Sequence, residues 1–147
     1  MKKALSFIVS ITTIFLFCAP YLYAAEKVHL IPIDDALKKN NHLLDSNIKL
    51  SFSPKIQENL ILDRGFFISN RKTNGVFKTF ESSCTRAFLS AIISLQERAV
   101  KEGGNAVINI HSFYKKKEMF SEEVFECHEG NIMSGVALKG RVVWIDS

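Results

Sequence analysis

Four cysteine and histidine residues of this sequence could carry chemistry. Cys127 and His128 are adjacent in the segment FECHEGNIMSG, while Cys84 lies far upstream and His111 stands between them. Such a set could form a nucleophile with its base, a zinc site, or one disulfide beside two ordinary histidines. The choice depends on the compartment of the protein and on the elements that position these residues.

The amino-terminal segment has the pattern of a secretory signal peptide. Two lysines precede an uncharged apolar run, and Ala24 is a small residue suited to the cleavage position. We therefore expect residues 1–24 to be removed and residues 25–147 to form a single periplasmic domain. Cys18 is lost with the signal, because the bulky residues before it disfavour a lipoprotein anchor.

The mature chain then keeps two cysteines, Cys84 and Cys127. An even pair in an exported chain predicts one disulfide bond. Zinc could instead use both cysteines with His111 and His128, but no close Cys-x-x-Cys or His-x-x-x-His pair organises such a site. Neighbouring residues of an extended segment point to opposite sides, which weighs against joint action of Cys127 and His128 as ligands or as nucleophile and base. We expect no cofactor, and the alternative metal set is His111, Cys127 and His128.

Charge and glycine spacing weigh against nucleic acid and nucleotide partners. The chain has 19 Lys+Arg and 15 Asp+Glu, and its basic run Lys115–Lys117 is followed by acidic residues that would oppose a phosphate backbone. The glycines of Gly130–Gly135 have the spacing of a phosphate loop. However, Val136 and Ala137 stand where a lysine and a hydroxyl residue must follow.

The best-defined element is a helix over residues 84–102. Cys84 begins an apolar stripe at three- and four-residue spacing, Ser82 and Ser83 are candidate N-caps, and Gly103-Gly104 is suited to a helix end. A cysteine in the buried stripe is typical of a structural role, because a reactive thiol needs exposure.

Extended segments surround this helix in the sequence. We expect strands over residues 28–33, 48–52, 59–70, 105–113, 119–127 and 136–145, a short helix over 34–39 and a turn over 72–75. Alternation assigns Ala106, Ile108 and Ile110 to one face of their strand, and it places Trp144 on the same face as Val142. The predicted class is α+β, with a mixed or antiparallel sheet packed against one long helix.

The disulfide constrains how the last strands connect. A simple hairpin of 105–113 with 119–127 would carry Cys127 to the far end of the helix, about 25 Å from Cys84 by the rise per residue. A disulfide requires alpha carbons within about 7 Å. We therefore expect that residues 114–127 do not form a closed hairpin.

Several phrases resemble a known group of bacterial envelope domains. The order of Cys84, the long helix, Gly104–Val107, His111-Ser112, Cys127 and Ser134–Leu138 resembles the RcsF and YbjQ-like group. Phrases similar to small exported proteins often mislabelled excinuclease ATPase subunits are Ala87–Ala91, Leu95–Ala99, Phe125–His128 and Gly135–Gly140.

The resemblance implies an α+β domain in which a cysteine at the helix start bridges one that follows the first core strand. Cys84 and Cys127 occupy those positions. YbjQ-like domains are often described as heavy-metal-binding. The signalling role of RcsF is not implied, because Phe113 stands where its second bridge would need cysteine.

We therefore expect a non-enzymatic periplasmic protein of a Gram-negative bacterium that acts by protein–protein interaction in envelope maintenance, stress response or an envelope-spanning, secretion-type machine. Its expected partners are envelope proteins, with a homo-oligomer as a further option. A metal-binding module using Cys and His is the first alternative, and a small hydrolase is the second. Exposed phenylalanines would mark a partner site, although core packing is the default expectation for each candidate: Phe66, Phe67, Phe77, Phe80 and Phe120.

Overall fold

The computed structural model describes residues 26–55 and 59–146, and the expected signal peptide lies outside these ranges. In chain order the elements are β1 (Lys27–Pro32), α1 (Ile33–Lys39), the 3-10 turn η1 (Asn41–Leu43), β2 (Lys49–Leu50), β3 (Leu60–Asn74), α2 (Phe80–Lys101), β4 (Ala106–Ser112), the 3-10 turn η2 (Tyr114–Lys116), β5 (Val124–Glu129) and β6 (Met133–Ile145).

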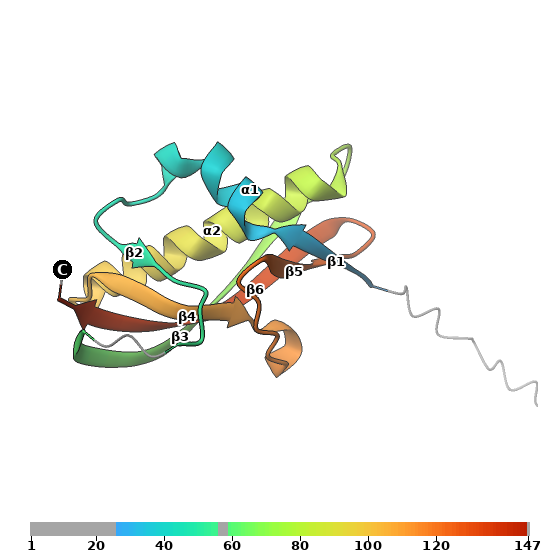
Figure 1. Cartoon of the computed structure of the whole chain (residues 1–147). Coiled ribbons are helices and arrows are strands. Elements are labelled where there is room, and N and C mark those ends of the chain that lie inside the picture. The colour runs from blue at the N-terminus through green and yellow to red at the C-terminus, as the bar shows by residue number, and fades with distance from the viewer. Residues whose placement is uncertain (1–25, 56–58, 147) are drawn as a thin grey trace, which may run out of the picture.

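Six strands form one mixed sheet. Its order is β1-β5-β6-β4-β2, and β3 pairs with β6 along the whole of that strand. β2 runs parallel to β4, whereas the other pairings are antiparallel. Both helices lie on the same face of this sheet (Figure 1), and we call the opposite face the outer face. The predicted α+β class, with one long helix on a mixed sheet, is confirmed.

The main core lies between α2 and the sheet. It is built from the apolar stripe of the helix and the inward residues of β4, β5 and β6, including Cys84, Phe88, Ile92, Leu95, Val107, Ile110, Phe125, Cys127, Val136, Leu138 and Val142. Phe88 stacks on Phe125 of β5 with ring centroids 4.0 Å apart. Full burial of each large apolar side chain contributes about 1.5–3 kcal/mol.

The long helix begins one turn before its predicted start. Thr79 is the N-cap, and its hydroxyl accepts a hydrogen bond from the Ser82 amide at 3.2 Å. The prediction of Ser82 or Ser83 as the cap was therefore wrong. The end of the helix is as expected, because Gly103 adopts a φ of 71° and the Gly104 amide donates to the Ala99 carbonyl at 2.8 Å.

A bulge in β4 overturns the predicted alternation. Asn109 has a φ of 50°, and the pairing of β4 with β6 shifts between Ile108 and His111. Ile110 consequently joins the main core, whereas Ala106 and Ile108 belong to a separate outer-face cluster of buried residues. Asparagine tolerates the left-handed conformation that inserts the additional residue.

Two further predictions need correction. β3 continues through Asn74, so residues 72–74 are strand and the turn follows them. Of the extended stretch 119–127, only the part from Val124 onward belongs to β5.

A single antiparallel bridge of Ser112 with Met119 closes the loop after β4, but the predicted absence of a β4–β5 hairpin agrees with the structure. β5 pairs with β1 and the start of β6 instead of β4. The Glu126 amide donates to the Ser112 hydroxyl at 2.9 Å, which places this end of β5 beside the end of β4. Cys127 therefore reaches the start of α2.

Candidate functional site

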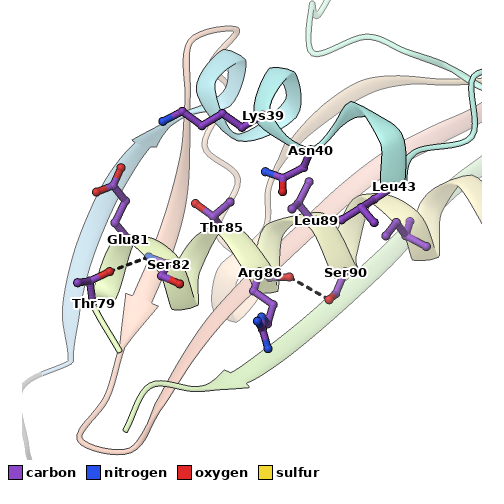
Figure 2. Close-up of a pocket in the computed structure, with 11 residues that line it drawn as sticks. Lys39, Asn40, Leu43, Thr79, Glu81, Ser82, Thr85, Arg86, Leu89 and Ser90 are labelled. Carbon is purple, nitrogen blue, oxygen red and sulfur yellow. Dashed lines mark hydrogen bonds between the residues drawn. The ribbon is translucent and has the colours of Figure 1, made fainter. Parts of the chain in front are cut away.

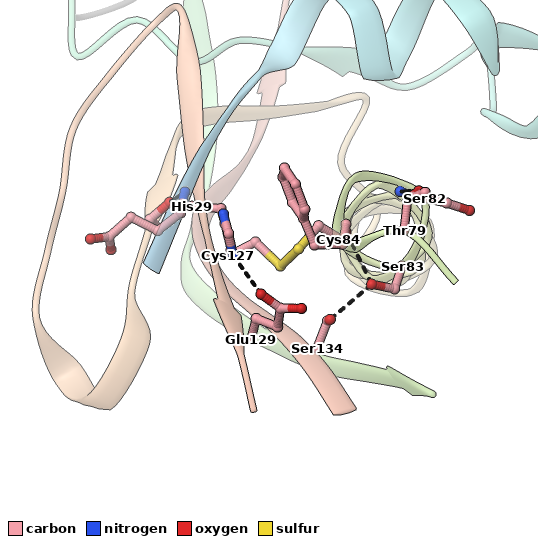
Figure 3. The surroundings of a disulfide bond; sticks show 11 residues. His29, Thr79, Ser82, Ser83, Cys84, Cys127, Glu129 and Ser134 are labelled. Atoms are coloured by element: carbon pink, nitrogen blue, oxygen red, sulfur yellow. Dashed lines mark hydrogen bonds and ion pairs between the residues drawn. A yellow bond between two sulfur atoms is a disulfide. The ribbon is translucent and has the colours of Figure 1, made fainter. Parts of the chain in front are cut away.

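Cys84 and Cys127 form the predicted disulfide. Their alpha carbons are 5.7 Å apart, and both residues are completely buried. The bond joins the first turns of α2 to β5 (Figure 3). Because both sulfurs are bonded to each other, neither is available as a thiolate nucleophile or a zinc ligand while the bond is intact.

Polar contacts beside the disulfide hold the same elements together. The Ser83 hydroxyl, which donates to the Phe80 carbonyl, lies 2.8 Å from the Ser134 hydroxyl of β6. His29 of β1 lies 2.7 Å from a Glu129 carboxylate oxygen of β5 and stacks on Phe80 with centroids 4.2 Å apart. Figure 3 shows the Ser83–Ser134 and His29–Glu129 pairs beside the disulfide. Their geometry indicates a structural site.

His128 lies on the side of β5 opposite to the disulfide. Its ring stacks on Tyr114 with centroids 3.4 Å apart, and its Nδ1 is 3.9 Å from a carboxylate oxygen of Glu26. Burial lowers the pKa of His128, while the neighbouring Glu26 carboxylate partly opposes that shift. The Lys115 ammonium donates to Glu26 at 2.8 Å, and the Tyr114 hydroxyl donates to it as well, so the pKa of Glu26 is lowered.

His111 lies in a different cluster, on the outer face. Its side chain is nearly fully buried beneath Phe120, with ring centroids 4.2 Å apart. Its Nδ1 lies 2.8 Å from the Asn109 carbonyl, and its Nε2 lies 3.6 Å from a Glu118 carboxylate oxygen. The two histidines thus have different neighbours.

The alternative metal set is not assembled. Cys127 is bonded to Cys84, His128 packs on Tyr114, and His111 packs on Phe120. Residues 26–55 and 59–146 include no group of three or more histidine, cysteine, aspartate and glutamate side chains that could hold a metal ion. In this arrangement His111 and His128 also cannot serve one reaction centre with Cys127.

A cluster of apolar and charged side chains, most of them exposed, lies around the partly buried Lys139 at the outer face. Its members, which we call the Lys139 cluster, are Phe66, Ile68, Phe113, Glu118, Phe120 and Lys139. The Lys139 ammonium is 5.0 Å from the ring centroid of Phe66 and 4.8 Å from that of Phe113. It also donates to Glu118 at 2.6 Å, and this contact lowers the pKa of the Glu118 carboxylate. These contacts orient the rings by cation–π attraction and ion pairing.

Three side chains of this cluster are exposed to a larger fraction than side chains packed in a core. Phe66 is 47 % exposed, Ile68 58 % and Phe120 50 %. Of the five phenylalanines named from the sequence, Phe67 packs against the core, and the others keep large exposed fractions. The sequence analysis missed Ile68 and Lys139. Alternation along β3, with Phe66 and Ile68 opposite to Phe67, is the signal that could have identified Ile68.

A shallow hollow lies between the α1–η1 segment and α2. Its volume is about 470 Å³, and its lining includes Lys39, Leu43, Leu89 and Ile93. Several polar groups around it serve α2 itself, because Thr79 caps the helix and the Ser90 hydroxyl donates to the Arg86 carbonyl (Figure 2). None of the catalytic or metal candidates from the sequence lines this hollow.

The disulfide is consistent with an oxidising, exported location. Within the two described ranges, no helix combines the length and the hydropathy that a membrane span requires. The chain matches no model of a known protein family, and no curated protein matches it. The likeness to RcsF and YbjQ-like domains therefore stays a prediction.

Proposed function

We propose that the chain is a non-enzymatic periplasmic protein that binds envelope proteins, and that it serves envelope maintenance, stress response or an envelope-spanning, secretion-type machine. The observation that carries this proposal is the exposed Lys139 cluster on the outer face. It presents two half-exposed phenylalanines and an isoleucine beside two charged groups. Exposed aromatic residues are typical of the centres of protein–protein interfaces, whereas charged residues such as lysine and glutamate are found mainly at the rim.

The cluster is well organised for binding. Phe66 also lies beneath Arg141, whose guanidinium carbon is 5.6 Å from the ring centroid, and Arg141 is itself paired with Asp63. Side chains that are already held in place lose less conformational entropy when a partner covers them. The apolar area of such a patch is the main source of binding free energy, because charged pairs at a surface contribute little.

The disulfide supports an extracytoplasmic scaffold role for the domain. Its position at the buried junction of α2 and β5 stabilises the fold and leaves the sulfurs inaccessible to substrates. The proposed function therefore depends on the shape of the domain and on its exposed side chains, with the cysteines acting through stability.

Site-specific photocrosslinking in the periplasm of the native host tests this proposal. A photoreactive phenylalanine analogue replaces Phe66 or Phe120. Val100 of α2, which is exposed to a similar extent, is the matched control site. We expect both cluster positions to form an adduct with the same envelope protein, and we expect the control to form none. Equal adducts at all three positions, or none at the cluster, would contradict the proposal.

A further inference from the structure

β3 is a long strand with one free edge. Within the described ranges it pairs with β6 alone, and its register is unbroken from Gly65 to Asn74. Every second residue of such an edge directs its backbone N–H and C=O away from the neighbouring strand. A row of unpaired backbone groups is a template to which another extended segment can add.

Four arginines lie along this edge, on the side where β3 meets α2. The guanidinium of Arg98 is 5.0 Å from the ring centroid of Phe67, and Arg71 donates to the Ser94 hydroxyl at 2.7 Å. Arg64 reaches Gly103 at the end of α2, with its Nη2 3.9 Å from where a beta carbon of that glycine would lie. Arg86 lines the hollow between the α1–η1 segment and α2, and its side chain extends from the helix on the side of β3 (Figure 2). We call Arg64, Arg71, Arg86 and Arg98 the arginine row.

The arginine row carries an excess of positive charge. In the part of the chain that the structure describes, one carboxylate, that of Glu102, forms an ion pair with the row, at 3.2 Å from Arg98. Guanidinium groups bind carboxylates through paired, charge-assisted hydrogen bonds. The row would also oppose the pairing of two β3 edges from two copies, because that pairing brings both rows together.

We propose that the free edge of β3 binds an extended, acidic segment of a partner protein, which adds as a strand while its carboxylates meet the arginine row. The proposal rests on the proposed function, since it names the chemistry of a partner. Backbone hydrogen bonds to β3 supply the extended geometry, and charge complementarity selects acidic side chains. A surface that bound anionic lipid would need the charges alone and not the strand edge.

Synthetic peptides measure this binding directly by fluorescence anisotropy on the purified, oxidised protein. The probe is a labelled peptide of alternating glutamate and valine. A lysine–valine peptide controls for charge, and a glutamate–valine peptide with N-methylated valines keeps the charge but loses backbone donors. We expect the unmethylated glutamate–valine peptide to bind and the lysine–valine peptide not to bind. N-methylation should lower the affinity of the acidic peptide at least tenfold. Equal binding of the methylated and unmethylated acidic peptides would overturn strand addition.

Protein variants and hydrogen exchange locate the site. We expect the double variant Arg71→Gln with Arg98→Gln to bind the acidic peptide with at least tenfold lower affinity. The charge-matched double variant Lys49→Gln with Lys78→Gln should keep its affinity for the peptide within twofold of the unchanged protein. Circular dichroism checks that both proteins fold.

Bound peptide should slow amide exchange within Gly65–Asn74. Absence of protection in this segment would overturn the proposal. The proposal would also be overturned if phosphatidylglycerol vesicles displaced the peptide and the arginine and lysine variants lost peptide affinity equally. If the analogue at position 66 crosslinks an envelope protein but the acidic peptide does not bind, this inference is rejected and the proposed function is retained.

Discussion

Reduction of the Cys84–Cys127 bond should remove a large part of the stability of the domain. The two cysteines are 43 residues apart in the sequence. In the chain-entropy description, a loop of this length closed in the unfolded state stabilises the folded state by about 4 kcal/mol at 25 °C. A domain of this size has a total free energy of unfolding of about 5–15 kcal/mol. The bond therefore decides whether the domain is robust or marginal.

Urea unfolding of the oxidised and reduced protein, followed by circular dichroism, measures this effect. With a urea dependence of about 2 kcal/mol per molar, a loss of about 4 kcal/mol lowers the midpoint by about 2 M. The double variant Cys84→Ala with Cys127→Ala is the control, because reductant should not change its midpoint. It avoids the unpartnered buried hydroxyls that serine would introduce at these sites.

A difference below about 1 kcal/mol between the oxidised and reduced protein would refute the loop-entropy reasoning. Unfolding must be reversible and two-state for this comparison, which coincident transitions by fluorescence and circular dichroism establish.

Three further changes have expected outcomes. Gly140→Ala should destabilise the fold by about 1–3 kcal/mol in urea unfolding, because its methyl group would lie 2.6 Å from Val107; the control Gly135→Ala, on the same strand, meets its nearest atom at 3.6 Å and should change little. Thr79→Ala should cost about 1 kcal/mol through loss of the helix cap, and an unchanged melting temperature would contradict that role. The pKa of His128 lies below its ordinary 6.5, so the unfolded chain binds more protons than the folded one as the pH falls below about 6.5, and the stability of the fold decreases. His128→Phe should reduce the difference between the urea midpoints measured at about pH 7.5 and about pH 5.5. An equal difference in the variant and the unchanged protein would count against this role of His128.

The sequence predicted the helix and the disulfide because both depend on strong signals. The apolar stripe from Cys84 has helical spacing along several turns, and the glycine pair ends it. Two cysteines in an exported chain leave one pairing. The cap was misplaced because serine and threonine are both favourable caps, and the choice of Thr79 depends on where the helix begins in the folded chain.

Predictions failed where a single residue changed the strand register. The left-handed Asn109 moved Ile110 into the main core, and no local pattern distinguishes this asparagine from a loop residue. The exposure of Phe66 and Phe120 could not be predicted either, because composition cannot show which face of the sheet the helices cover. The clusters around His128 and Lys139 join residues that are distant in sequence, so only the fold brings them together.

The disulfide also determines which part of the domain responds to reduction. β5 pairs with β1 over six positions but with β6 at two, so the β1–β5 pair is joined to the rest of the sheet by few backbone contacts within the described residues. The Cys84–Cys127 bond and the Phe88–Phe125 stack hold that pair against α2. Reduction should therefore speed amide exchange in β1 and β5 before it affects β3, whose long pairing with β6 is independent of the bond. The Lys139 cluster and the β3 edge would then keep their shape under conditions that loosen the other end of the domain, and a binding surface in the envelope would survive partial reduction.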